Sequence, residues 1–84
     1  MQEQVVTDAL EEIVRRFAPK NRVTALGAQT HLIHEAGIDS PRMIDLVLGV
    51  EDAFGITVDD EDLDRVKTFG QLVDLVGTRA AEAA

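Results

Sequence analysis

Apolar residues recur every three or four positions over residues 3–18, a spacing that predicts an amphipathic helix. Charged residues fill the positions between them. Pro19 should end this helix, because proline disfavours helical dihedral angles at the residue before it. The expected apolar face consists of Val6, Ala9, Leu10, Ile13, Val14 and Phe17.

Residues 19–39 lack a sustained periodicity and are expected to form a long connection. Loops of this length in compact domains are usually functional or carry contacts with the core. We expect Val23, Leu26, Leu32 and Ile33 to provide those contacts. Residues 30–35 leave room for one helical turn.

A second helix is predicted from Pro41 to Phe54. Ser40 suits the N-cap, Pro41 suits the first helical position, and Gly55 suits the C-terminal stop. After the short stretch 56–58, the acidic residues 59–64 are expected to form one or two helical turns.

A last helix should begin at Thr68, because Thr68 and Gln71 have the spacing of a capping box. Residues 79–84 are expected to fray, which leaves an ordered core of about residues 3–78. The predicted fold is a single all-α domain, 1–84. It would be a small four-helix bundle of three main helices and one short one.

The second helix has more apolar residues than one buried face needs. Met43, Leu46, Val47, Val50 and Phe54 define the core side. A second stripe mixes apolar and acidic residues, which favours docking of a partner that has basic residues around an apolar groove. Partial burial of this stripe under the long loop is the alternative. The stripe contains Pro41, Ile44, Asp45, Leu48 and Asp52, with Glu51 at its side.

Negative charge is concentrated in one third of the chain. The formal net charge is −8, and residues 39–64 contain nine acids against the single base Arg42. Such a surface repels nucleic acid and anionic membranes. It either steers a basic protein partner or simply keeps a small domain in solution.

Composition narrows the remaining classes of protein and of binding site. There is no cysteine, so disulfides and thiolate metal sites are excluded. The polar start of the chain differs from a signal peptide, and no apolar run is long enough to cross a bilayer. We expect a soluble, monomeric protein of the cytoplasm.

Three sequence patterns that could indicate a reactive or metal-binding site match their known motifs only weakly. Ser40 lacks the glycines of a nucleophile elbow, and His31 and His34 precede it with no evident orienting residue. The two histidines with Glu35 do not form a zinc-protease motif. Asp60, Asp62 and Asp64 resemble half of a calcium loop that lacks its glycine and its bidentate glutamate.

The order of motifs along the chain resembles the acyl carrier protein family. The family pattern Gly-x-Asp-Ser reads Gly37-Ile38-Asp39-Ser40 here, and an acidic amphipathic helix follows it. The extended link and acidic turn at 55–62 and the closing segment 68–76 match the family in order and spacing. The resemblance covers nearly the whole chain.

This resemblance implies that Ser40 receives a phosphopantetheine arm from coenzyme A and that the chain itself catalyses nothing. The arm would carry acyl thioesters in a polyketide or fatty-acid-type pathway. The implied partners are a phosphopantetheinyl transferase and acyltransferase, ketosynthase or ligase-type enzymes with basic surfaces. Ile44 would shape the entrance beside the arm, and the residues read by partners would be Asp39, Asp45, Leu48, Glu51, Asp52, Asp60 and Glu61.

Two positions depart from the family pattern. Pro41 replaces a bulky apolar residue after the serine, and Glu35-Ala36-Gly37 preceded by His34 replaces an acidic-Leu-Gly segment. Pro41 therefore alters a partner contact. Two alternatives stay open: a carrier of aminoacyl or peptidyl groups, and an unmodified acidic adaptor.

Overall fold

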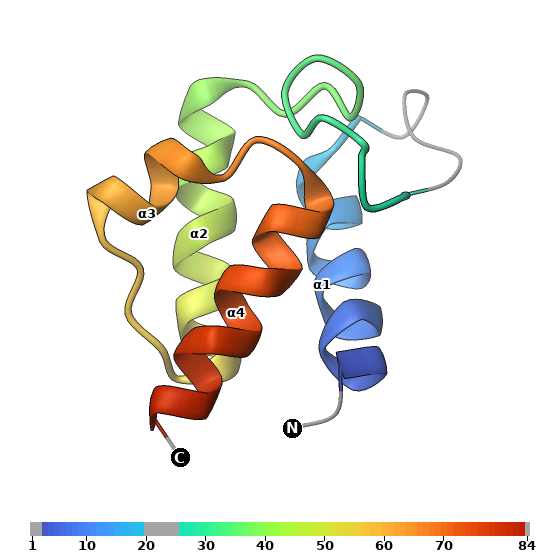
Figure 1. Ribbon diagram of the computed structural model, residues 1–84. Helices are drawn as coiled ribbons and strands as arrows, with labels where there is room; N and C mark the ends of the chain where they lie inside the picture. The colour runs from blue at the N-terminus through green and yellow to red at the C-terminus, as the bar shows by residue number, and fades with distance from the viewer. Residues whose placement is uncertain (1–2, 20–25, 84) are drawn as a thin grey trace.

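The computed structural model describes residues 3–19 and 26–83. It contains α1 (Glu3–Phe17), α2 (Ser40–Phe54), α3 (Asp60–Arg65) and α4 (Phe69–Ala83). The three long helices form a bundle, and the short α3 lies beside α2 (Figure 1). Within the described residues, the β pairing amounts to a single bridge between His31 and Thr68. The predicted all-α bundle of three main helices and one short helix is confirmed.

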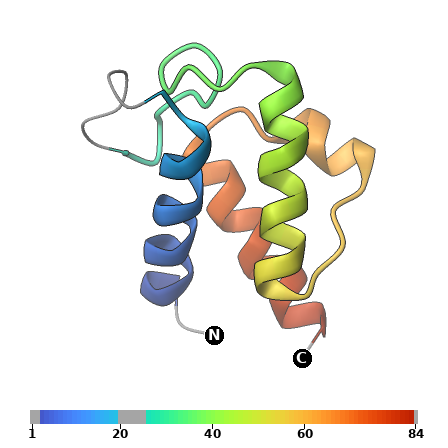
Figure 2. The same cartoon turned by 180° about the vertical axis from the view of Figure 1, so that it is seen from behind.

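The core lies where α1 packs against α2 and α4. Figure 2 shows this arrangement from behind, with α4 beyond α1 and α2. Each fully buried aliphatic side chain contributes about 1.5–3 kcal/mol through removal of apolar surface from water. The helical residues in this core are Val6, Leu10, Ile13, Val14, Met43, Leu46, Val50, Phe69, Leu72, Val73 and Val76. Val47 and Phe54, predicted on the same side of α2, are half-buried at its edge.

The long connection follows its prediction only in part. Leu32 is fully buried and Leu26 packs against the core, but Ile33 is 39% exposed, so its predicted core contact is wrong. The cause is the local turn, in which the amides of Glu35 and Ala36 both donate to the carbonyl of His31. The turn occupies 32–36 and includes hydrogen bonds of helical spacing, from the Glu35 amide to the His31 carbonyl and from the Gly37 amide to the Ile33 carbonyl, so the helical turn expected at 30–35 lies slightly later in the chain. Val23 lies outside the described residues.

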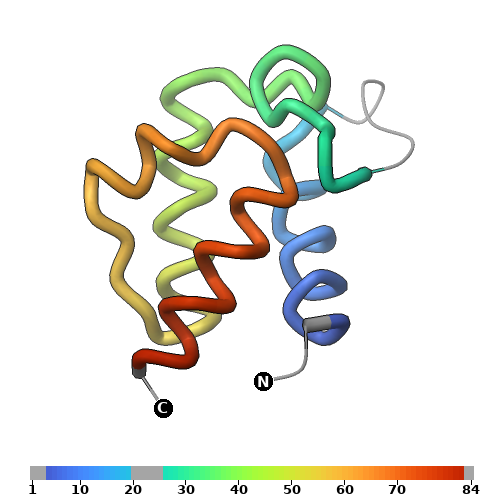
Figure 3. Tube along the Cα trace, in the orientation of Figure 1, coloured from blue at the N-terminus to red at the C-terminus, as the bar shows by residue number. Residues whose placement is uncertain are grey.

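The same loop is bound to the start of α4 (Figure 3). The first amides of a helix have no partner within the helix. Here the amide of Phe69 donates to the Thr30 carbonyl at 3.0 Å, and that of Gly70 donates to the Ala28 carbonyl at 2.8 Å. The predicted capping box is also present, because Gln71 N donates to Thr68 Oγ1 and Thr68 N donates to Gln71 Oε1. The loop that leads to Ser40 is thereby fixed.

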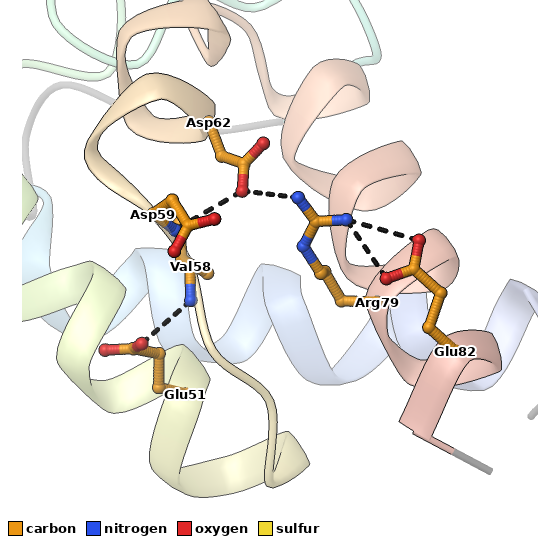
Figure 4. A network of polar contacts seen from close by, with 6 residues as sticks. All are labelled: Glu51, Val58, Asp59, Asp62, Arg79 and Glu82. Carbon is orange, nitrogen blue, oxygen red and sulfur yellow. Dashed lines mark hydrogen bonds and ion pairs between the residues drawn. The ribbon is translucent and has the colours of Figure 1, made fainter.

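The last helix extends further than the sequence pattern suggests. We expected ordered structure to end near residue 78, but α4 continues to Ala83. Arg79 donates to Asp62 of α3 at 2.6 Å, and it also pairs with Glu82 at 3.2 Å (Figure 4). The predicted boundary was wrong because these partners come from the tertiary fold and from the segment that was expected to fray.

Candidate functional site

The start of α2 is capped one residue earlier than predicted. Asp39 is the N-cap, and its carboxylate accepts a hydrogen bond from the amide of Arg42 at 3.0 Å. Ser40 is the first helical residue, so the prediction of Ser40 as the cap was wrong. An aspartate carboxylate satisfies the free amide as well as a serine hydroxyl does. The Ser40 hydroxyl is therefore not used for capping, and the residue is exposed.

The backbone before Ser40 is held in place on its inner side. Gly37 has a φ of 78°, a conformation that favours glycine over residues with a Cβ. The next residue, Ile38, is fully buried, and its amide donates to the Leu32 carbonyl at 3.0 Å. Asp39 and Ser40 then emerge at the surface. The Gly37–Ser40 motif thus presents the serine from a fixed loop.

A surface pocket of about 240 Å³ lies beside Ser40. We call it the Ser40 pocket. Its walls come from the long loop, from α2, and from α3 and the segment after it. Most of the lining is apolar, with one carboxylate and one ammonium group. The lining residues are Ile33, Ser40, Met43, Ile44, Leu63, Asp64, Val66 and Lys67.

The groups around Ser40 offer a limited choice of partners for an anion. Pro41 has no amide hydrogen, and the amides of Arg42 and Met43 both donate to Asp39. The Arg42 guanidinium donates to the carbonyl of Phe17 at the end of α1. Lys67 is the base that lines the pocket. The helix dipole still favours a negative charge here, but the cap uses the amides of Arg42 and Met43, which a helix start would otherwise leave free.

The mixed stripe on α2 is exposed. Ile44 is 55% exposed and Leu48 is 57% exposed, so the loop does not cover either of them. Their acidic neighbours on α2 and on the adjoining α3 are also at the surface. The other exposed members of the predicted set are Asp39, Pro41, Asp45, Asp52, Asp60 and Glu61.

Glu51 differs from the rest of that set. It is half-buried, and its Oε2 accepts a hydrogen bond from the amide of Val58 at 2.8 Å (Figure 4). This contact holds the link between α2 and α3 against α2. Glu51 therefore has a structural role that the sequence did not reveal.

The link and α3 are held further by Asp62. Its carboxylate accepts from the amide of Asp59 at 3.3 Å and from Arg79 at 2.6 Å. The hydrogen bond from the Arg79 guanidinium lowers the pKa of the Asp62 carboxyl, with the Asp59 amide acting in the same direction. The same pairing raises the pKa of Arg79. Asp62, considered above for calcium, is thus engaged in an ion pair.

The two histidines belong to the structure of the loop. His31 Nδ1 accepts hydrogen bonds from the amides of Ile33 and His34, and the two rings lie 4.3 Å apart. Within residues 3–19 and 26–83, no three His, Cys, Asp or Glu side chains are grouped so as to hold a metal ion. Over the same residues, no helix has the length and apolar character to span a membrane.

Sequence reasoning missed several residues of the Ser40 pocket. Ile33, Leu63, Asp64 and Lys67 join it from the loop, α3 and the segment before α4. The segments that form this pocket are far apart in the chain, so a periodic pattern could not reveal that they meet. The bonding of the loop to the start of α4, which includes Leu32 N to the Lys67 carbonyl at 2.9 Å, brings them together.

Comparison with known proteins places these features in a family. A family model described as the phosphopantetheine attachment site matches residues 5–76. The acyl carrier protein of an Exiguobacterium species is 29% identical over 77 residues, which cover 92% of this chain and 95% of that protein.

Two solved structures are similar along nearly their whole length. The crystal structure of a Thermotoga maritima acyl carrier protein has a TM-score of 0.81 and 25% identity, covering 100% of this chain and 96% of that one. A hexanoyl carrier of the actinorhodin polyketide synthase of Streptomyces coelicolor has a TM-score of 0.81 and 26% identity, covering 93% of each chain. The chain belongs to the acyl carrier protein family, whose members are carriers, not catalysts, and bear a covalently attached phosphopantetheine.

Proposed function

We propose that Ser40 bears the phosphopantetheine arm, and that the chain passes acyl thioesters between enzymes of a polyketide or fatty-acid-type pathway. The observation that carries this proposal is the exposed Ser40 at the start of α2, beside a pocket of about 240 Å³. Ser40 is also the only serine in the sequence. No other serine can therefore serve as the attachment point.

The residues around Ser40 fit such an arm. The helix dipole and Lys67 both favour the negative phosphodiester, the dipole by about 0.3–1 kcal/mol. The apolar walls formed by Ile33, Met43 and Ile44 suit the uncharged part of the arm. The terminal thiol of the arm holds the acyl group as a thioester, which agrees with a chain that has no cysteine of its own.

Partner enzymes are proposed to dock on the exposed stripe of α2. Ile44 and Leu48 supply the apolar contact, and Asp45 and Asp52 supply charge for a basic rim. The partners would be a phosphopantetheinyl transferase, followed by acyltransferase, ketosynthase or ligase-type enzymes. Asp39, Pro41, Asp60 and Glu61 extend this surface. Glu51 contributes its charge from a half-buried position.

The likeness to the actinorhodin polyketide synthase carrier supports the polyketide side of the proposal. The relatives that are named only as acyl carrier proteins do not point to one pathway, so a fatty-acid-type pathway remains part of the proposal. Loading assays with matched acyl and aminoacyl substrates separate acyl from aminoacyl cargo. Transfer of amino acids alone would contradict the acyl assignment.

The direct test is intact mass spectrometry after incubation with coenzyme A and a broad-specificity phosphopantetheinyl transferase. We expect the wild-type chain to gain one phosphopantetheine and Ser40→Ala to gain none. A second carrier protein in the same tube shows that the transferase is active. An unchanged wild-type mass in that mixture would favour the unmodified adaptor and contradict the proposal.

A further inference from the structure

An imidazole ring caps the turn that precedes Ser40. The amides of Ile33 and His34 donate to Nδ1 of His31 at 3.2 and 3.1 Å. In return, the amide of His31 donates to the Glu35 carboxylate at 2.9 Å. This reciprocal pattern resembles a capping box, with an imidazole nitrogen in place of the oxygen of serine or threonine. His31 therefore fixes the beginning of the turn at 32–36.

The capped turn holds the backbone from which Ser40 is presented. Ile33 is bonded on both sides, because its amide donates to the His31 ring and its carbonyl accepts the amide of Gly37 at 3.1 Å. The side chain of Ile33 also lines the Ser40 pocket. Beyond Gly37, Ile38 is fully buried, and its amide is bonded to the same turn. A short series of contacts thus connects the His31 ring to the motif that contains Ser40.

The cap requires a neutral His31. A backbone amide can only donate a hydrogen bond, so the Nδ1 atom that receives two of them carries no proton. In the protonated ring both nitrogens carry a proton, and the proton on Nδ1 would face the two amide protons. The amides of Ile33 and His34 would then lose their acceptor. Histidine is the side chain whose charge ordinarily changes at physiological pH, so this loss falls within an accessible range.

Charged and titratable groups lie beside His31 on two segments. On its own loop, the His34 ring is 4.3 Å from the His31 ring, and Glu35 accepts the His31 amide. Across the β bridge, His31 pairs with Thr68, which follows Lys67. Glu35 favours a positive charge on His31, whereas Lys67 and a protonated His34 oppose it. Neither cation has an acceptor atom to offer the two amides. The cap therefore depends on the protonation of His31 itself.

We propose that neutral His31 is a positioning residue for the modification of Ser40, and that protonation of His31 releases the turn and slows the reaction. The proposal rests on the function proposed above, because it concerns how the Ser40 hydroxyl is presented to the transferase. His31 acts through the turn and the Gly37 backbone. A capping side chain shifts its local equilibrium by about 2- to 30-fold, which sets the scale of the expected effect.

The first test measures the cap in the unmodified chain, so it does not depend on whether Ser40 receives an arm. Amide hydrogen exchange at Gly37 and Ile38 reports opening of the turn. As the pH falls from about 7.5 to about 5, we expect wild-type protection factors to fall by about 2- to 30-fold. His31→Asn should keep them constant, because its carboxamide oxygen occupies the place of Nδ1 and does not titrate. Constant protection in the wild-type chain would overturn the proposal.

The second test measures the positioning of Ser40. Wild type and His31→Asn compete in one tube for coenzyme A and a broad-specificity transferase, and intact mass distinguishes their products. The pH response of the transferase itself therefore cancels. We expect the wild-type rate to fall by about twofold or more relative to His31→Asn between about pH 7.5 and about pH 5. His31→Ala, which lacks an acceptor, should be slow at both values.

His34→Asn is the matched control, because it removes the neighbouring ring and leaves Nδ1 of His31 and both amides in place. It should respond to pH as the wild type does, and loss of the response in this variant would contradict the role given to His31. A competition ratio independent of pH would contradict the positioning role even if the exchange result were as expected. A chain that gains no arm in any variant contradicts the proposed function and the positioning role with it, while the exchange measurement still decides whether the cap titrates.

Discussion

Ser40 and Lys67 belong to different segments, yet both line the same pocket. Asp39 precedes Ser40 in the chain, and Asp64 lines the pocket together with Ser40. The Arg42 guanidinium is already hydrogen-bonded to the Phe17 carbonyl at the end of α1. A phosphodiester on Ser40 therefore has Lys67 as its lining cation. This makes Lys67 a residue whose effect should depend on whether the arm is present.

We predict that Lys67→Gln lowers the stability of the loaded protein, which carries the arm on Ser40, more than that of the unloaded protein, which lacks it. The difference in unfolding free energy should be about 0.2–1 kcal/mol, the usual size of an exposed ion pair. Urea titrations of both forms measure it. Arg65→Gln is the control, because Arg65 is an exposed base that does not line the Ser40 pocket. Equal losses in loaded and unloaded forms would show that Lys67 has no contact with the arm.

At this scale the sequence identifies some residues and not others. Ser40 could be found because its neighbours form a local motif and because it begins a helix. Its capping role could not be assigned correctly, since Asp39 and Ser40 both suit an N-cap. The exposure of Ile33 depends on the loop turn, and the place of Lys67 depends on contacts with Leu32. Neither the exposure of Ile33 nor the place of Lys67 can be predicted from a few consecutive residues.

Among the elements, the loop 26–39 and the start of α4 form one structural unit. Gly70 is essential to it, since a Cβ at this position would lie 2.7 Å from the carbonyl oxygen of Ala28. That oxygen already accepts the Gly70 amide at 2.8 Å, so the two backbones are in close contact.

We predict that Gly70→Ala destabilises the protein by about 1–3 kcal/mol through this overlap. Alanine has a higher helix propensity than glycine, but the overlap is the larger effect. Gly77→Ala in the same helix is the matched control, because its Cβ would meet open space. It should stabilise by about 0.5–1 kcal/mol. Thermal or urea unfolding compares the two, and a stabilising Gly70→Ala would refute the close approach.

The attachment of α3 to α4 should depend on pH. The pKa of Asp62 is lowered below its ordinary value of 3.8, so the folded state binds this proton less readily than the unfolded state does. Its contribution to stability is therefore present above pH 3.8 and is lost as the pH falls below that value. Asp62→Asn should cost stability at neutral pH and little in strong acid.

Urea unfolding from neutral pH to about pH 2.5 measures this difference. The comparison is best made in a Glu82→Gln background, because Glu82 is a second carboxylate that pairs with Arg79. If the stability difference between the chains with and without Asp62→Asn persisted unchanged in acid, the ion pair would be excluded as its cause.

The elements themselves could largely be predicted. Periodic apolar positions and proline and glycine boundaries located α1 and α2 within one residue of their observed ends. The end of α4 was misplaced because Arg79 finds Asp62 on another helix. The structural role of Glu51, which receives the Val58 amide, is also a tertiary contact. Local patterns predict helices well, and they do not predict the polar contacts between them.

For the whole molecule, the net charge of −8 is concentrated on the segment that begins at Asp39. We predict that Asp45→Lys slows modification by a basic transferase severalfold at low salt, because it weakens electrostatic steering. The effect should shrink at high salt, where the screening length falls to about 3 Å at 1 M.

Asp74→Lys changes the net charge equally from an exposed position on α4, and it is the control. Stopped-flow or initial-rate measurements over a salt series, with circular dichroism to verify folding, compare the two variants. Equal slowing by both would mean that total charge matters and that the α2 surface has no special part.

The central claim is that Ser40 carries the acyl-bearing arm, and peptide mapping tests it most directly. Trypsin should release residues 23–42 as one peptide, which contains Ser40 together with Thr24 and Thr30. After treatment with the transferase and an acyl coenzyme A, tandem mass spectrometry should locate one acyl-phosphopantetheine on Ser40. A modification on either threonine or in another peptide, or an unmodified 23–42 peptide from a reaction with active transferase, would contradict the account.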